Sequence, residues 1–138
     1  MFVSKPLAHQ QCVVCGSAFF SDQCLEYQAL SADSVQATIV ATQKVQGYVG
    51  VMQGGLISAL HDSAMLHCLF HLGVTAMTAA LTVRFHQPVP IGQSICITAR
   101  VVKKRRHIYW LESNVCCDGV ICSSASSQFM PMNSNENR

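Results

Sequence analysis

A single carboxylate interrupts the most apolar long stretch of this 138-residue chain, VMQGGLISALHDSAMLHCLFHLG at residues 51–73. Asp62 has no Lys or Arg close to it in the sequence, and Gly54 and Gly55 stand where a helix would begin. A buried carboxylate can accept a proton in a reaction, or it can accept hydrogen bonds from Ser58 or from the backbone of a neighbouring chain. A glycine in the first turn leaves its backbone N–H open to close approach. Both candidate groups therefore belong to one predicted helix, Gly54 at its start and Asp62 eight residues further along.

The pattern around this stretch predicts one long helix between two groups of strands. The helix is expected from about Gly54 to Leu72, with Gly73 as its C-terminal stop. Alternating segments predict strands at 24–30 and 34–43 before the helix, and at about 78–89, 94–104, 107–116 and 120–129 after it. The helix is apolar nearly all round, so it must be enclosed. The predicted fold class is therefore α+β, with a strongly curved antiparallel sheet wrapped around one central helix.

Composition narrows the classes of protein to which the chain can belong. Half of the residues are apolar, 12% are charged and the net charge is +2, which favours neither nucleic acid nor a membrane as a partner. We expect one domain over residues 1–138, with a leader at about 1–23 and a disordered tail at about 132–138. The start of the chain has no signal-peptide pattern and no segment is apolar enough to span a bilayer. A cytoplasmic location is the expectation.

Eight cysteines raise the question of a metal site. Cys12 and Cys15 have metal-ligand spacing, and His9 and Cys24 could complete a set of four ligands. A second closely spaced cysteine pair would strengthen this interpretation, but Cys116 and Cys117 are adjacent and point to opposite faces of a strand. We therefore predict free thiols and no metal. His67 and His71, four residues apart, also lack a third ligand, and we expect them to satisfy polar groups near the helix end.

The order of elements and two sequence runs resemble a known family. The run GYVGVMQGGLISALHDSAM is similar to the G-x-x-H-G-G-x-x-x-x-x-x-D-x-A signature of the PaaI-like acyl-CoA thioesterases. The following MTAALTVRFHQPVPIGQ resembles the third-strand pattern of that family, and CVVCG at 12–16 resembles a leader of some members. The resemblance covers about residues 12–130. It implies the hotdog fold and thioester hydrolysis with no cofactor, coenzyme A being part of the substrate.

The resemblance also implies roles for particular residues. Asp62 matches the catalytic carboxylate, as general base or nucleophile, and the backbone N–H of Gly54 matches the donor to the thioester carbonyl. Thr78 matches a Ser or Thr that positions the attacking water. The chain departs from the family pattern at Gln53, where His is usual, and at Gly47, where many members have Asn. Gln53 is expected to hold the loop or the substrate carbonyl in place of that His.

The spacing of the two main groups has a geometric consequence. Eight helical residues separate Gly54 from Asp62, which is about 12 Å along the axis. Both groups must lie within about 3 Å of one reacting centre. If both act, Gly54 of one chain must therefore work with Asp62 of another, in a homodimer whose central helices run antiparallel across a two-fold axis. Dimers can pair further through their outer sheet faces, so a tetramer made as a dimer of dimers is equally open.

Substrate contacts are expected at three other places. Gly55 and Tyr48 border the predicted path of the acyl or pantetheine chain. The basic run Lys103, Lys104, Arg105 and Arg106 can either bind the phosphates of coenzyme A or form a solvated turn that discourages aggregation. An acyl-CoA is thus the expected small-molecule partner. The alternatives are an acyl-CoA binding protein or sensor without catalysis and, ranked lower, a hydratase that uses the five-residue spacing of Asp62 and His67.

Overall fold

The computed structural model describes residues 1–132 and contains the predicted order of two strands, one long helix and four strands. The strands are β1 (Gln28–Ser31), β2 (Ser34–Val40), β3 (Ala76–Phe85), β4 (Ser94–Arg105), β5 (Ile108–Cys117) and β6 (Val120–Pro131). The helix α1 spans Gly54–His71, and Gly73 follows it with a φ of +77°, as the helix-stop pattern predicted. Two short 3₁₀ helices, η1 (Leu7–His9) and η2 (Gln43–Val45), lie in the connections before α1.

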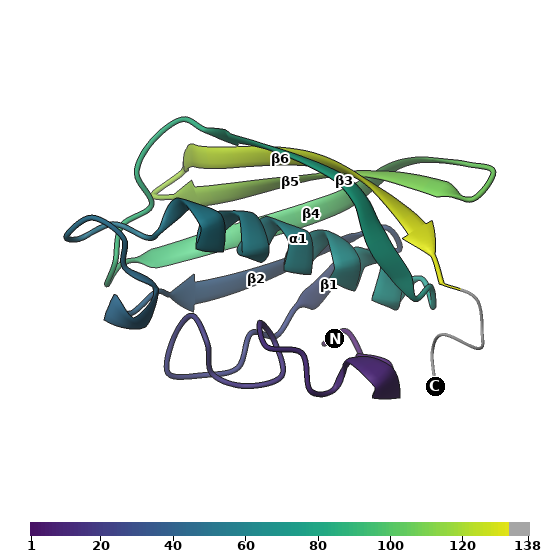
Figure 1. Ribbon diagram of the computed structural model, residues 1–138, viewed down its shortest axis with the longest axis horizontal. Helices are drawn as coiled ribbons and strands as arrows, with labels where there is room; N and C mark the ends of the chain where they lie inside the picture. The colour runs from purple at the N-terminus through teal and green to yellow at the C-terminus, as the bar shows by residue number, and fades with distance from the viewer. Residues whose placement is uncertain (133–138) are drawn as a thin grey trace.

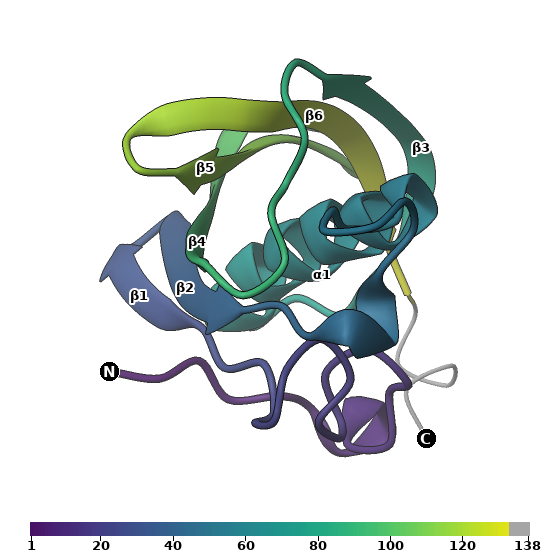
Figure 2. The same ribbon diagram turned by 90° about the vertical axis from the view of Figure 1, so that its left-hand side faces the viewer.

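The six strands form one antiparallel sheet that curves around α1 (Figures 1 and 2). Its spatial order is β1-β2-β4-β5-β6-β3, so β1 and β3 are the two edge strands. Burial alternates along the strands: on β5, Tyr109, Leu111, Ser113 and Val115 are buried, and the residues that alternate with them are more exposed. Asp118 and Gly119 both have positive φ and close a tight hairpin between β5 and β6. The curved sheet around one helix confirms the predicted α+β hotdog fold.

The core lies between the concave face of the sheet and α1. Leu60, Ala64, Met65 and Leu69 of the helix are completely buried. The leader covers the helix where the sheet does not reach it, as Figure 2 shows below α1. Its residues Cys15 and Phe20 are buried in the same core cluster, so the leader is an integral part of the packing.

Four predicted boundaries were wrong. The strand predicted at about 78–89 is β3, and it ends at Phe85, before the connection that contains Pro88. The strand predicted over 24–30 is confined to β1, because the buried residues before Gln28 lie on irregular backbone of the leader. The strand predicted to end at residue 43 stops at Val40, where η2 redirects the chain toward α1. The β4–β5 turn lies at residues 106–107, not 104–106. The predicted disordered tail, about 132–138, falls outside the described residues except for Met132.

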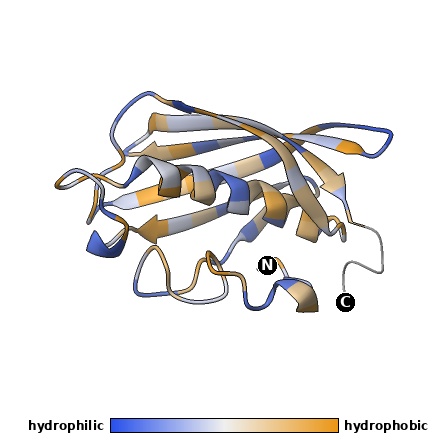
Figure 3. Ribbon diagram, in the orientation of Figure 1, coloured by the Kyte–Doolittle hydropathy of each residue, from blue (hydrophilic) through white to orange (hydrophobic). Residues whose placement is uncertain are grey.

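The helix α1 is not a candidate for crossing a bilayer. Across residues 1–132, no helix combines the length and the hydropathy that a membrane span requires. The hydropathy colouring in Figure 3 shows polar residues at the tip of the β4–β5 hairpin.

Candidate active site

Asp62 lies in the middle of α1 and is joined to the edge strand β3. The Thr78 hydroxyl donates a hydrogen bond to Oδ1 of Asp62. The ladder between β3 and β6 is irregular between Thr78 and Ala80, so the strand carries a bulge next to this contact. Bulges of this kind re-aim a side chain out of the regular pleat. The structure thus brings together two of the predicted site residues from separate elements.

Burial controls the protonation of this carboxyl group. Removal from solvent raises the pKa of Asp62, because the charged form loses hydration. The hydrogen bond from Thr78 and the nearby charge of His9 act in the opposite direction, since both stabilise the carboxylate. A carboxylate with a raised pKa accepts a proton more readily at neutral pH than an exposed aspartate does.

The first turn of α1 presents open backbone donors. Among the described residues, the N–H groups of Gly54 and Gly55 have no hydrogen-bond acceptor, as is usual for the first turn of a helix. A methyl group added at Gly54 would meet only the Phe85 ring, at 3.8 Å, which is an ordinary contact. The packing of this chain therefore leaves the Gly54 backbone accessible, as a donor to a ligand would require.

Gln53 is the N-cap of α1. Its Oε1 accepts the N–H of Leu56 at 2.8 Å, which satisfies one of the free donors of the first turn. Gly47 packs directly against this residue: a Cβ at position 47 would lie 3.0 Å from the Cα of Gln53. The two departures from the family pattern are therefore neighbours in space, and an Asn at position 47 would require this loop to move.

Residues 1–132 leave part of α1 uncovered. Gly55, Ala59, Asp62 and Leu66 follow one another at helical spacing, and none of them is buried. The adjacent strand β3 has one edge that no other described strand pairs with, and it exposes Met77 (53%) and Phe85 (56%). The exposed surface formed by α1 and β3 is therefore partly polar and partly apolar, and it contains the Asp62 carboxylate.

The other predicted contact residues lie apart from one another. Tyr48 is 89% exposed in the loop that precedes α1. The basic run Lys103–Arg106 is at the tip of the β4–β5 hairpin, at the opposite end of the molecule from that loop (Figure 1). Lys103 and Lys104 lie over the rings of Trp110 and Tyr109, at 4.5 and 5.5 Å from the ring centroids. One chain alone does not bring this run to Gly54.

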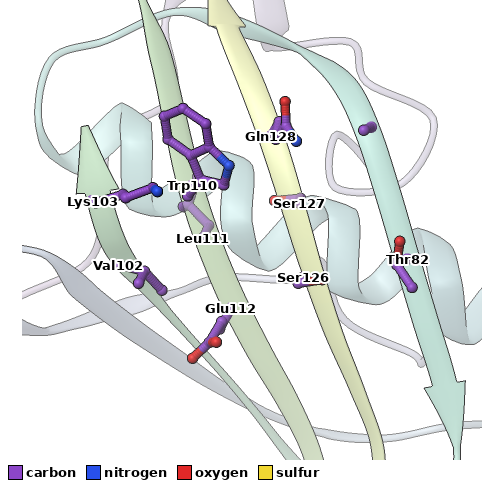
Figure 4. Close-up of a pocket in the computed structure, with 10 residues that line it drawn as sticks. Thr82, Val102, Lys103, Trp110, Leu111, Glu112, Ser126, Ser127 and Gln128 are labelled. Carbon is purple, nitrogen blue, oxygen red and sulfur yellow. The ribbon is translucent and has the colours of Figure 1, made fainter. Parts of the chain in front are cut away.

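A shallow groove of about 330 Å³ is present on the outer face of the sheet, with α1 on the other side (Figure 4). It is bordered by Thr82, Lys103, Trp110, Glu112 and Gln128, among others. It contains neither Asp62 nor Gly54, so it is separate from the candidate chemistry.

Two buried histidines were not expected as parts of the core. His61 is fully buried, with Nδ1 2.6 Å from the Ser113 hydroxyl and Nε2 2.8 Å from that of Ser123. Burial lowers the pKa of His61 to about 4, so it is neutral at pH 7. His67 is buried too: its Nδ1 donates to the Ser63 carbonyl, and its pKa is lowered to about 4. Its neighbour in the predicted pair, His71, bonds instead to the Ser31 carbonyl.

Comparison with known proteins identifies the family to which this chain is similar. The sequence model of the thioesterase superfamily matches residues 49–119. A thioesterase superfamily protein of known crystal structure is 28% identical over 78% of this chain, with a TM-score of 0.70. The match covers 53% of that protein, so this chain spans about half of its length.

Two further solved structures share the fold at lower identity. A hypothetical thioesterase protein from Streptococcus pneumoniae TIGR4, crystallised with coenzyme A, has a TM-score of 0.76 at 15% identity, over 85% of this chain and 95% of its own. That protein was also crystallised as an Asp-to-Ala mutant and as a Thr-to-Ala mutant. The E. coli PaaI protein from the phenylacetic acid degradation operon has a TM-score of 0.73 at 15% identity, over 79% of this chain and 80% of its own.

The fold, the order of elements and the sequence match agree. Because the family model covers residues 49–119, more than half of the sequence, this chain belongs to the thioesterase superfamily.

Proposed function

We propose that this protein hydrolyses acyl-CoA thioesters. The observation that carries the proposal is the pairing of Asp62 with Thr78 on an accessible face of α1, on the same helix as the free N–H of Gly54. Membership of the thioesterase superfamily supports the reaction class. The coenzyme A bound to the pneumococcal relative supports the substrate class.

In the proposed reaction, Asp62, Thr78 and Gly54 have different roles. Asp62 accepts a proton from water as the water attacks the thioester carbonyl, or it attacks the carbonyl itself as a nucleophile. Thr78 holds the carboxylate in place and helps to position the water. The carbonyl oxygen becomes negative in the tetrahedral intermediate, and the N–H of Gly54 donates to it, helped by the positive end of the helix dipole. The tetrahedral intermediate then collapses and the coenzyme A thiolate leaves. On the nucleophilic route, water next hydrolyses the acyl-aspartyl anhydride, which releases the acid and restores the Asp62 carboxylate.

The proposed site is shared between two chains. Gly54 and Asp62 lie on one continuous helix, about 12 Å apart along its axis, and this distance is too long for one reacting centre. An antiparallel second copy would place its Gly54 near Asp62 of the first. The uncovered helix face and the free β3 edge are surfaces on which such a copy can pack.

We propose that the basic residues at the β4–β5 hairpin tip bind the coenzyme A end of the substrate. Arg105 and Arg106 are exposed at the hairpin tip next to Lys103 and Lys104, and phosphate groups prefer such clusters. Since this tip lies far from Gly54 of its own chain, the proposal is that it serves a site to which another chain contributes. Tyr48 and Gly55 remain proposed borders of the acyl or pantetheine path.

Release of free thiol from acyl-CoA substrates tests the proposal directly. Asp62→Asn keeps the size of the side chain but removes the base, so we expect kcat to fall by about 10²–10⁴-fold. Coenzyme A binding should persist. Asp118→Asn is the matched control, because this exposed turn residue has a positive φ that Asn also tolerates. Unchanged hydrolysis in Asp62→Asn would refute the assigned role.

A second candidate function is acyl-CoA binding without turnover. Gln53 favours it, because its side-chain oxygen is engaged in capping α1 and the His of the family pattern is missing. In that case the wild-type protein would bind acyl-CoA and release no thiol across short, long and aromatic acyl groups.

A further inference from the structure

The leader contains a cluster of metal-ligand atoms that the proposed thioester chemistry does not use. One ligand atom from each of His9, Cys12 and Cys15 lies within 4.8 Å of the others. All three residues precede the first strand, and Cys15 is fully buried in the core cluster to which residues of α1 also belong. We propose that His9, Cys12 and Cys15 bind a zinc(II) ion that fastens the leader to the helix.

The backbone around the two cysteines is folded as a tight knuckle. The N–H of Val14 points at the Cys12 sulfur, 3.4 Å away, and the N–H of Gly16 donates to the Cys12 carbonyl at 2.7 Å. A Cβ on Gly16 would come within 2.6 Å of the Cys12 carbonyl oxygen and 2.8 Å of the Gln10 carbonyl oxygen. Only glycine fits there. The sequence H-x2-C-x2-C-G therefore forms a tight turn, and both sulfurs lie within 4.8 Å of one imidazole nitrogen of His9.

The ligand types select the metal. Two thiolates and an imidazole suit zinc, whereas hard cations such as Mg²⁺ and Ca²⁺ prefer oxygen ligands. Binding converts two thiols to thiolates and releases their protons, with no change of oxidation state. The spacing of Cys12 and Cys15 alone predicted free thiols; the approach of His9 to both sulfurs in three dimensions changes that prediction.

His67 is the candidate for the fourth ligand. Its Nδ1 donates to the Ser63 carbonyl, so Nε2 carries the lone pair, and this buried Nε2 has no hydrogen-bond partner among the described residues. A backbone carbonyl that fixes the far nitrogen is the usual support of a metal-bound histidine. The ring centroids of His9 and His67 are 6.2 Å apart. Two imidazoles on one tetrahedral zinc would have centroids about 5 Å apart, so the leader needs to move by about 1 Å.

Metal content of the purified protein tests this site independently of catalysis. We expect about one zinc per chain in the wild type after reducing purification, and loss of that zinc in the double variant Cys12→Ser, Cys15→Ser. Cys24→Ser is the matched control, because Cys24 is an exposed thiol of the same leader outside the cluster. Circular dichroism verifies that each variant is folded. If the double variant does not fold, the single variant Cys12→Ser takes its place, because Cys12 is less buried than Cys15.

Cobalt(II) provides a second readout of the same ligands. A folded wild-type protein loaded with cobalt should show thiolate-to-metal charge-transfer absorption, which Cys12→Ser weakens and Cys24→Ser preserves. His67→Gln should lower the affinity for zinc by about tenfold or more; unchanged affinity would overturn the assignment of His67. A wild-type protein without zinc after metal supplementation, or with a Cys12–Cys15 disulfide in its place under the same reducing conditions, would overturn the site.

Discussion

At the scale of single residues, burial of Asp62 and the hydrogen bond from Thr78 together control the pKa of the candidate base. Burial raises the pKa of Asp62 and this bond lowers it. A general base must be ionised to accept a proton, so the hydrolysis rate should fall as pH drops through the pKa of Asp62. The acidic limb of the pH profile should lie above the ordinary aspartate value of 3.8.

Thr78→Ala tests this coupling. Loss of the hydroxyl removes an interaction that stabilises the carboxylate, so the acidic limb of kcat/KM should move to higher pH. The measurement is a pH series of thiol release, with Thr78→Ser as the control that keeps the hydroxyl and the wild-type profile. A limb that stays in place or moves to lower pH in Thr78→Ala would contradict the assignment.

Sequence reasoning identified these two residues for different reasons. Asp62 was conspicuous because a charge in an apolar helix needs an explanation. Thr78 came only from the family resemblance, since nothing in an alternating strand distinguishes one threonine from another. The buried role of His61 was missed, because its partners Ser113 and Ser123 come from strands more than 50 residues away. In the sequence, Ser113 and Ser123 look like ordinary polar positions of their strands.

At the scale of elements, the two buried histidines of α1 make the helix sensitive to acid. The pKa values of His61 and His67 are lowered to about 4 by burial, from 6.5. Between pH 4 and 6.5 the unfolded chain binds protons at these sites and the folded chain does not. Folding stability should therefore fall as pH drops through this window. The raised pKa of Asp62 acts in the opposite direction, but it is one group against two.

Thermal unfolding between pH 4.5 and 7.5 measures this effect. We expect Tm to decrease steadily below about pH 6.5. His107→Gln, at an exposed position in the β4–β5 turn, should leave the slope unchanged. A Tm that is flat or rises on acidification would show that the two histidines are not buried in their neutral form.

The helix was the element best predicted from sequence. Its length followed from an apolar run that ends at Gly73, a signal contained in adjacent residues. The first strand was predicted too long, because Leu25 and Tyr27 alternate as in a strand but are buried by the leader on irregular backbone. Packing of the leader against α1 involves contacts between distant segments, and a local pattern does not contain them.

At the scale of the whole molecule, the strand order is the main structural result and the shared site is the main proposal. The four strands after the helix follow one another along the chain, yet β3 pairs with β6 at the far edge and β2 pairs with β4. These pairings depend on how the sheet closes around α1. The resemblance implied this fold, whereas hydrophobic alternation alone would not have distinguished it from other curved sheets.

The central claim is that Gly54 of one chain acts with Asp62 of another. Gly54→Pro removes the N–H donor at a position where proline is tolerated, the first residue of a helix. The preceding Gln53 has φ −65° and ψ 135°, a conformation that suits the residue before a proline. Gly54→Ala is the control, because it keeps the N–H.

Complementation between two inactive variants tests the claim most directly. Asp62→Asn and Gly54→Pro should each lose thiol release when measured alone. After unfolding and refolding as an equal mixture, half of the dimers should be mixed, and each mixed dimer should contain one intact site. The account predicts recovery of about a quarter of the wild-type activity. No recovery in a mixture shown to contain mixed dimers would contradict the shared site.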